Sequence, residues 1–201
     1  METIYYRTVL PEILERVRQL SASKQLVLIG IDGCGGSGKS TFAAELSNSL
    51  GSVPVIHIDD FYKSSQERSL LTSSKPIGCQ FDWQRLERDV LKPLKAGSEA
   101  NYQRYDWNMD CLADWRNIQD LSPIIIEGIY VLRPELLMYY DLRLWIECPR
   151  DLRLKRGLER DGENARSQWE DDWMNEEDIY IAKFNPHLQA HKIIQGMPAI
   201  L

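Results

Sequence analysis

A glycine-rich segment from Gly33 to Ser40 offers the clearest chemistry in the chain. It reads GCGGSGKS and fits the pattern G-x-x-x-x-G-K-[ST] in full, between an aliphatic run and a predicted helix. Glycine lets backbone N–H groups turn inward around phosphate oxygens, and the start of a helix adds free donors and partial positive charge. The segment therefore predicts a nucleoside triphosphate site. The residues expected to hold the triphosphate are Gly33, Gly35, Gly36, Ser37, Gly38, Lys39, Ser40 and Thr41.

Two side chains of this segment have distinct expected roles. Lys39 is expected to place its ammonium group on the β- and γ-phosphates, and the Ser40 hydroxyl is expected to ligate Mg²⁺. Glu127 ends the aliphatic run PIIIE, and its carboxylate is expected to hold Mg²⁺ or to position Lys39; the alternative is a solvated loop residue. The pattern thus predicts a nucleoside triphosphate and Mg²⁺ as ligands, but it does not identify the phosphate acceptor.

Two aspartates, Asp59 and Asp60, follow the aliphatic run VPVIHI. A kinase that acts on an alcohol needs a carboxylate near the γ-phosphate to orient and deprotonate the acceptor hydroxyl, and this position suits that role. Spacing alone does not distinguish the two aspartates, and capping of the following turn is an alternative role. The N-K-x-D segment expected of a guanine-specific switch does not occur in the chain. The sequence therefore favours a small-molecule kinase over a nucleotide-hydrolysing switch.

The elements that must position these residues follow from the hydropathy pattern. Short, continuous apolar runs are typical of parallel strands buried on both faces, and the amphipathic stretches between them are typical of covering helices. In such open α/β sheets, ligands bind outside the carboxyl ends of the strands. We expect strands at 25–32, 53–59, 123–128, 142–148 and, more weakly, 191–196, with helices near 8–22, 38–50, 84–97, 149–161 and 163–184. Residues 63–78 are expected to form a surface loop or a short helix.

Length and composition are those of an ordinary globular protein. The 201 residues fit a single domain spanning 1–201, with 43% hydrophobic and 27% charged residues. The net charge of −6 and the lack of basic blocks argue against a nucleic-acid polymer as partner. No apolar run has membrane-spanning length and the N-terminus does not resemble a secretory signal, so we expect a cytoplasmic protein without a membrane partner. The four cysteines are far apart, which argues against a zinc site, and the oligomeric state is not indicated.

Six segments together resemble the uridine kinase-like branch of the P-loop kinases, which also includes phosphoribulokinase and pantothenate kinase. They are GCGGSGKST (33–41), DDFY (59–62), FDW (81–83), YQRYDW (102–107), IIIEGIY (124–130) and RDLRLKRGLERD (150–161). They span about two thirds of the chain in the order of the family. The resemblance implies a P-loop NTPase-type parallel sheet with a helical lid at about residues 150–165.

The resemblance also implies roles for individual residues. Asp59 matches the catalytic aspartate of a D-x-F-Y segment. The acceptor would be bound by Tyr62, Asp82, Arg104 and Tyr105. Lid arginines would close over the triphosphate, with Arg153 and Arg156 acting in catalysis and Arg160 in nucleotide binding. Independently, the spacing i, i+3, i+7 puts these arginines on one helix face, and guanidinium groups suit phosphate oxygens.

Structural alternatives exist for two of these assignments, and the acceptor pocket departs from its relatives. Asp82 suits the N-cap of the helix expected near Gln84, and a charged helix face is usually only solvated. Uridine kinases usually read F-D-H-P where this chain reads FDWQ, and no histidine lies between His57 and His187. We therefore expect an ATP-dependent kinase that acts on an alcohol group of a small molecule, with a nucleoside, pantothenate or a sugar phosphate as candidate acceptors. The alternative is a nucleotide-binding regulatory protein of the same fold without phosphotransfer.

Overall fold

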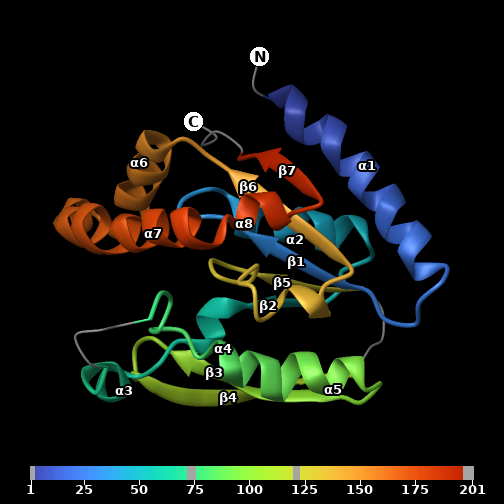
Figure 1. Cartoon of the computed structure of the whole chain (residues 1–201), viewed down its shortest axis with the longest axis horizontal. Helices are drawn as coiled ribbons and strands as arrows, with labels where there is room; N and C mark the ends of the chain where they lie inside the picture. The colour runs from blue at the N-terminus through green and yellow to red at the C-terminus, as the bar shows by residue number, and fades with distance from the viewer. Residues whose placement is uncertain (1–2, 72–75, 120–122, 197–201) are drawn as a thin grey trace.

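The computed structural model describes residues 3–71, 76–119 and 123–196. It contains a five-stranded parallel sheet with the strand order β2-β5-β1-β6-β7 and a separate two-stranded sheet (Figure 1). The parallel strands are β1 (Leu28–Asp32), β2 (Val55–His57), β5 (Ile124–Glu127), β6 (Leu142–Glu147) and β7 (Lys192–Gln195). All five strands expected from the sequence are present, and the predicted parallel α/β sheet is confirmed.

Side chains of the central strands alternate between the two faces of this sheet, because successive residues of a strand point in opposite directions. Leu28, Ile124 and Ile126 belong to the core on one face, whereas Ile29 and Ile125 belong to the core on the other. Each is fully buried, which stabilises the fold by about 1.5–3 kcal/mol per side chain. The first face is covered by α4 (Trp83–Leu86), a π-helical turn (Glu87–Leu91) and α5 (Lys92–Lys95), and the second by α1 (Thr3–Ser21) and α2 (Lys39–Ser49).

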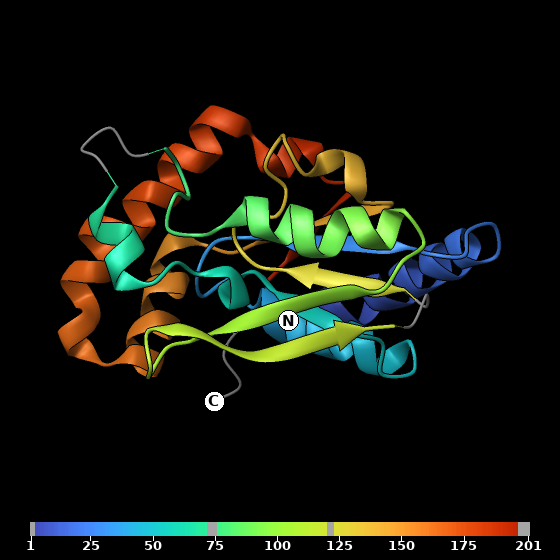
Figure 2. The same cartoon turned by 90° about the horizontal axis from the view of Figure 1, so that it is seen from below.

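A β-hairpin that the hydropathy pattern does not predict lies beneath the helix that runs from α4 to α5 (Figure 2). Strands β3 (Ala100–Asp106) and β4 (Cys111–Ile118) pair in antiparallel fashion, with Tyr102 opposite Arg116. Strand β4 is largely exposed, so it shows neither a buried apolar run nor a clear alternation. The hairpin places β3 against the turn that follows β2, which is a 3₁₀ helix at Ile58–Phe61.

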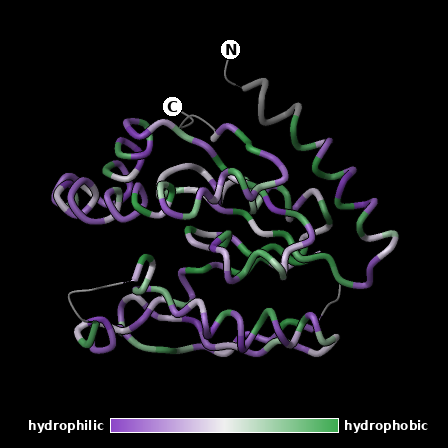
Figure 3. The backbone as a smooth tube through the Cα atoms, viewed as in Figure 1, coloured by the Kyte–Doolittle hydropathy of each residue, from purple (hydrophilic) through white to green (hydrophobic). Residues whose placement is uncertain are grey.

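Residues 150–184 form a helical arm beside the carboxyl ends of the parallel strands. The arm consists of α6 (Arg150–Asp161), a 3₁₀ turn (Glu163–Ala165), a π-helical turn (Gln168–Trp173) and α7 (Met174–Phe184). Its own small core contains Leu158, Trp169 and Met174, whereas Tyr180 packs with Trp145 against the main body. Figure 3 shows mainly hydrophilic residues along α6 and α7, at the left of the view.

Three further short helices complete the described fold. They are α3 (Ser65–Ser69), which starts with a capping box at Ser64, a 3₁₀ helix (Leu137–Tyr139) and α8 (Pro186–Gln189). The short α3 agrees with the loop or short helix expected in residues 63–78, of which 72–75 lie outside the described residues. Among the described helices, none combines the length and the hydropathy required to cross a bilayer.

Candidate active site

The loop between β1 and α2 provides hydrogen-bond donors for an anion. Gly36 has a φ of +73° and Gly38, the N-cap of α2, has a φ of +93°, so both adopt the left-handed conformation that favours glycine. The first N–H groups of α2 have no carbonyl partner within the helix. The buried Ser37 hydroxyl also lacks a hydrogen-bond partner among the described residues. The loop can therefore hold phosphate oxygens as the sequence predicts.

Glu127, at the end of β5, lies beside the start of α2. The Ser40 hydroxyl donates to Glu127 Oε1 over 3.0 Å, and His57 Nδ1 lies 2.5 Å from the same oxygen. Burial alone would raise the pKa of Glu127, but the hydrogen bond with His57 and the charge of Lys39 hold this pKa below its usual value. Its buried Oε2 has no partner within the described part of the chain. An ionised carboxylate with a free oxygen, next to a serine hydroxyl, fits Mg²⁺, which prefers oxygen ligands.

Asp59 and Asp60 have different environments at the end of β2. Asp59 lines a pocket together with Lys39; desolvation raises the pKa of Asp59, and the charge of Lys39 opposes this rise. The Asp60 carboxylate instead accepts a hydrogen bond from the Tyr102 hydroxyl over 3.2 Å. Asp60 is not among the described residues that line the pocket. The geometry therefore distinguishes two aspartates that spacing alone does not.

The pocket beside Asp59 has a volume of about 420 Å³, within the range of small-ligand cavities. Tyr62 and Trp107 stack in it, with ring centroids 4.5 Å apart and an interplanar angle of 29°. Its aromatic lining consists of Tyr62, Phe81, Trp107, Tyr130, Trp169 and Trp173. Its charged lining consists of Lys39, Asp59, Arg160, Asp161, Glu176 and Glu177. Residues from the phosphate loop, the turn after β2, the hairpin and the helical arm thus meet in one cavity.

Of the four residues expected to bind the acceptor, Tyr62 lines this pocket and the other three lie outside its lining. Asp82 is the N-cap of α4 and accepts from the Arg85 N–H over 3.0 Å, which is the alternative role expected from the sequence. The Tyr105 hydroxyl donates to Asp110 over 2.5 Å, while its ring packs edge-on against Trp107. Arg104 has a buried Nε without a partner among the described residues.

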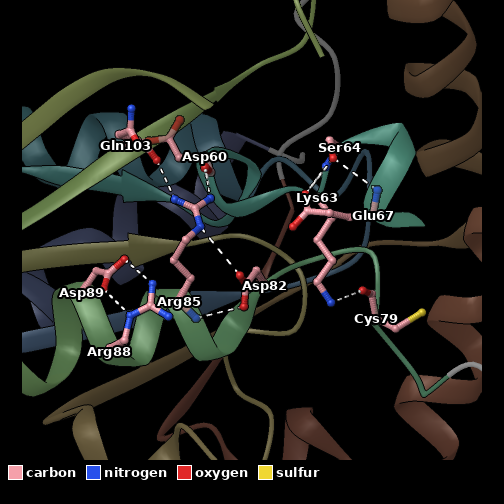
Figure 4. Close-up of polar contacts among 10 residues, drawn as sticks. All are labelled: Asp60, Lys63, Ser64, Glu67, Cys79, Asp82, Arg85, Arg88, Asp89 and Gln103. Atoms are coloured by element: carbon pink, nitrogen blue, oxygen red, sulfur yellow. Dashed lines mark hydrogen bonds and ion pairs between the residues drawn. The ribbon is translucent and has the colours of Figure 1, made fainter. Parts of the chain in front are cut away.

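Arg85 is a positioning residue for this region that the sequence analysis did not single out. Its side chain is buried and donates to the backbone carbonyls of Asp60 over 2.8 Å and Gln103 over 2.6 Å (Figure 4). It also lies 3.9 Å from the Asp82 carboxylate and over the Phe61 ring. Arg85 therefore fixes the turn that carries Asp59 against the hairpin. Its i, i+3 spacing from Asp82 is the one signal of this role in the sequence.

The three lid arginines make different contacts, although they share one helix. Arg153 is buried and its Nη1 donates to Glu177 over 2.6 Å, and Arg156 Nη1 donates to the Gly36 carbonyl over 3.1 Å. Arg160 lines the pocket, where its guanidinium group donates two hydrogen bonds to the Asp161 carboxylate. Arg153 and Arg156 thus contact the surroundings of the phosphate loop, and Arg160 is the arginine that shares a cavity with Lys39 and Asp59.

Two buried carboxylates accept hydrogen bonds from backbone N–H groups of the phosphate loop, and neither was singled out from the sequence. Glu177 Oε1 accepts from the Gly35 N–H over 2.6 Å. Asp32 accepts from the N–H groups of Gly33 and Leu132 over 2.6 and 2.8 Å and from the Tyr180 hydroxyl over 2.7 Å. Asp32 was recognisable as a charged residue that ends an apolar run, whereas nothing separates Glu177 from the other charges of the helical arm.

Sequence comparison identifies the family to which this site belongs. A model described as the phosphoribulokinase / uridine kinase family matches residues 28–199. The chain belongs to this family of P-loop kinases. The uridine kinase of Ureaplasma parvum serovar 3 is 32% identical over 152 residues, which cover 69% of this chain and 70% of that protein. The uridine kinase of Borrelia duttonii is 33% identical over 138 residues, covering 67% and 66%.

Solved structures share the fold of this P-loop kinase. A possible uridine kinase from Bacillus stearothermophilus superposes with a TM-score of 0.66 at 23% identity, covering 91% of this chain and 99% of that chain. Phosphoribulokinase from Rhodobacter spheroides superposes with a TM-score of 0.61 at 18% identity, covering 86% and 71%. The predicted membership of the uridine kinase-like branch is confirmed, and the chain is a kinase of this family.

Proposed function

We propose that this kinase transfers the γ-phosphate of ATP to an alcohol group of a small molecule and that it requires Mg²⁺. The observation that carries the proposal is that Lys39, from the phosphate loop, and Asp59, from the turn after β2, line the same pocket. A cation for the transferred phosphate and a base for the acceptor hydroxyl are the two groups that this reaction needs side by side. A protein that only binds nucleotide does not require a base at the position of Asp59.

The reaction follows from these positions. The acceptor hydroxyl oxygen forms a bond to the γ-phosphorus while the bond from phosphorus to the bridging oxygen of ADP breaks, and Asp59 accepts the hydroxyl proton. The raised pKa of Asp59 makes its carboxylate a stronger base than an aspartate of ordinary pKa. Lys39 and Arg160 neutralise charge on the transferred group. Ser40 and Glu127 would hold Mg²⁺, which would supply further positive charge to the phosphate oxygens.

We infer that residues 150–165 act as a lid over the nucleotide. Arg160 reaches the pocket from the end of α6, whereas Arg153 and Arg156 tie α6 to Glu177 and to the Gly36 carbonyl. Closure of this helix over the triphosphate would exclude water and suppress hydrolysis. Arg153 and Arg156 then contribute to catalysis by fixing the position of the lid relative to the phosphate loop.

A nucleoside is the acceptor class that we propose. Relatives that cover two thirds of this chain carry the name uridine kinase. The aromatic lining suits a planar base, because flat rings stack with favourable dispersion and quadrupole interactions. Tyr62 lies at the centre of this lining, in contact with Phe81, Tyr105 and Trp107.

Replacement of Asp59 tests the proposal, with the neighbouring Asp60 as the matched control. We expect Asp59→Asn to lower kcat by about 10²- to 10⁴-fold while calorimetry shows unchanged ATP affinity, since the base is lost and the phosphate loop is kept. Asp60→Asn should retain activity within about tenfold, because Asp60 is outside the described pocket lining and an asparagine oxygen can still accept from the Tyr102 hydroxyl. A near wild-type rate for Asp59→Asn would refute the assignment of the base. ATP binding without turnover in a panel of nucleosides, pantothenate, glycerate and ribulose phosphate would favour a nucleotide-binding regulator.

A further inference from the structure

One wall of the acceptor pocket is a chain of hydrogen bonds that ends at Glu176 of α7. The Tyr62 hydroxyl donates to Gln80 Oε1 over 2.7 Å, and Gln80 Nε2 donates to Glu176 Oε2 over 3.3 Å. The Gly78 N–H donates to Glu176 Oε1 over 2.9 Å. All three side chains line the pocket. The Tyr62 bond fixes which end of the Gln80 amide faces Glu176, because the oxygen is already used as an acceptor.

This wall presents acceptor groups to a ligand, with one donor beside them. A carboxylate has about four lone-pair positions, and the described contacts of Glu176 use two of them. The Gln80 amide nitrogen carries a second hydrogen that remains available next to the carboxylate. Among the described residues, no lysine or arginine nitrogen lies within 4.0 Å of Glu176.

The positive charges of the pocket belong to the catalytic groups instead. Lys39 and Arg160 are the two cations in the described lining, and both act on the pKa of Asp59. Arg160 also faces Asp161, which accepts two hydrogen bonds from its guanidinium group. Arg68 lies over the Tyr62 ring but outside this lining. A phosphate or carboxylate on the acceptor would therefore meet the Glu176 carboxylate on this wall, where no cation of the described pocket lining pairs with it. Such like-charge contacts are unfavourable in a partly desolvated site.

We propose that Glu176 is a specificity-determining residue that selects an uncharged acceptor whose planar ring bears an exocyclic amino group. An amino group donates to the Glu176 carboxylate, and the ring nitrogen beside it accepts from the Gln80 amide. A carbonyl in place of the amino group would turn its lone pairs toward the carboxylate and lose this contact. Trp107, which stacks on Tyr62, provides the flat surface that such a ring requires, since the Arg68 guanidinium also lies over the Tyr62 ring. This inference rests on the proposed phosphotransfer to an alcohol in the same pocket.

Matched acceptors test the inference in the full-length protein with ATP and Mg²⁺. Cytidine and uridine differ by an amino group against a carbonyl, and so do adenosine and inosine; pantothenate and glycerate are anionic acceptors. For at least one pair, we expect kcat/KM for the amino member to exceed that for the carbonyl member by about tenfold or more. The reason is that the amino group donates a charge-assisted hydrogen bond to Glu176, which a carbonyl cannot do. Both anionic acceptors should be poorer than the better nucleoside.

Glu176→Gln keeps the shape of the side chain and an acceptor for the Gly78 N–H, but removes the charge. We expect it to reduce the amino-to-carbonyl ratio by about tenfold, whereas Glu170→Gln, at an exposed residue of the same arm that pairs with Arg166, should leave the ratio unchanged. A ratio of kcat/KM values does not depend on the folded fraction, so loss of stability cannot imitate this result. An unchanged ratio in Glu176→Gln, or preference for an anionic acceptor, overturns the inference but leaves the proposed phosphotransfer standing. Absence of phosphorylation of every acceptor overturns the proposed function and the inference with it.

Discussion

Replacement of Asp32 by asparagine should change how the stability of the protein depends on pH. The Asp32 side chain is fully buried behind the phosphate loop. This burial raises its pKa from 3.8 to about 6, although hydrogen bonds from Leu132, Tyr180 and Gly33 partly oppose the rise. The folded state therefore retains a proton at pH values where the unfolded chain has released it. As the pH rises through this interval, the free energy of unfolding must fall.

The size of the effect follows from the two pKa values. A pKa raised from 3.8 to about 6 corresponds to about 3 kcal/mol, at about 1.4 kcal/mol for each pH unit. About 2 kcal/mol of this loss should occur between pH 4 and pH 7, where most of the titration takes place. Asp32→Asn has no titratable group at this position. The wild-type protein should therefore lose about 2 kcal/mol of stability relative to the variant over this range.

Urea denaturation followed by tryptophan fluorescence at several pH values, at constant ionic strength, measures this difference. The comparison uses the difference in the free energy of unfolding between wild type and variant, and how this difference changes with pH. Any effect of the asparagine on stability that does not depend on pH therefore cancels. Asp141→Asn serves as a control of opposite sign, because hydrogen bonds from Lys24 and Leu28 outweigh burial and lower the pKa of Asp141; its stabilisation is lost as the pH falls below about 4. If the wild-type minus Asp32→Asn difference stays constant within about 0.5 kcal/mol from pH 4 to 7, the reasoning about burial is wrong. Should Asp32→Asn fail to fold, NMR titration of the Asp32 carboxyl carbon in the wild-type protein tests the same pKa.

Two further substitutions test the geometry around the phosphate loop and the turn after β2. Gly36→Ala should weaken ATP binding in calorimetry and cost about 1–3 kcal/mol of stability, because φ is +73° and a Cβ would lie 2.5 Å from the Arg153 carbonyl oxygen; Gly51→Ala, with a φ of +93° and open space around it, should keep full affinity. Arg85→Ala should lower the free energy of unfolding by about 2–4 kcal/mol, because two partly buried carbonyls lose their donors. The exposed Arg88→Ala should change it by less than about 0.5 kcal/mol, and equal costs for the two arginines would contradict the positioning role of Arg85.

Hydropathy was sufficient to predict the parallel sheet, because its strands are buried on both faces and stand out as apolar runs. Ile124, Ile125 and Ile126 show this directly, since consecutive isoleucines serve opposite cores. The hairpin lacked such a signal. Trp107 and Trp115 are 58% and 69% exposed, so the apolar residues of this region do not mark a buried face. Pairing of β3 with β4 comes instead from contacts that no local pattern encodes.

The candidate site was predictable where one element carries the chemistry and was less so where distant segments meet. Residues 33–38 form their loop from local glycine conformations, so the motif alone predicts a loop that can hold phosphate oxygens. Asp59 and Asp60 differ only in what surrounds them, and Tyr102 and Lys39 come from other elements. The spacing of Arg153, Arg156 and Arg160 correctly indicates one helix, but the partners of these arginines lie on α7 and on the phosphate loop.

The buried Glu177 carboxylate pairs with Arg153, an arginine close to the phosphate loop that is not part of the pocket lining. Glu177 accepts from the Gly35 N–H and also lines the pocket, and desolvation raises the pKa of Glu177 while that N–H group and Arg153 oppose the rise. A triphosphate bound at the loop would add negative charge close to this carboxylate. Arg153, paired with Glu177 over 2.6 Å, supplies the positive charge that offsets it. In the proposed triphosphate site, Arg153 therefore compensates the charge of the carboxylate that fixes the loop, and Arg160 is the arginine of the described pocket lining that lies with Lys39 and Asp59.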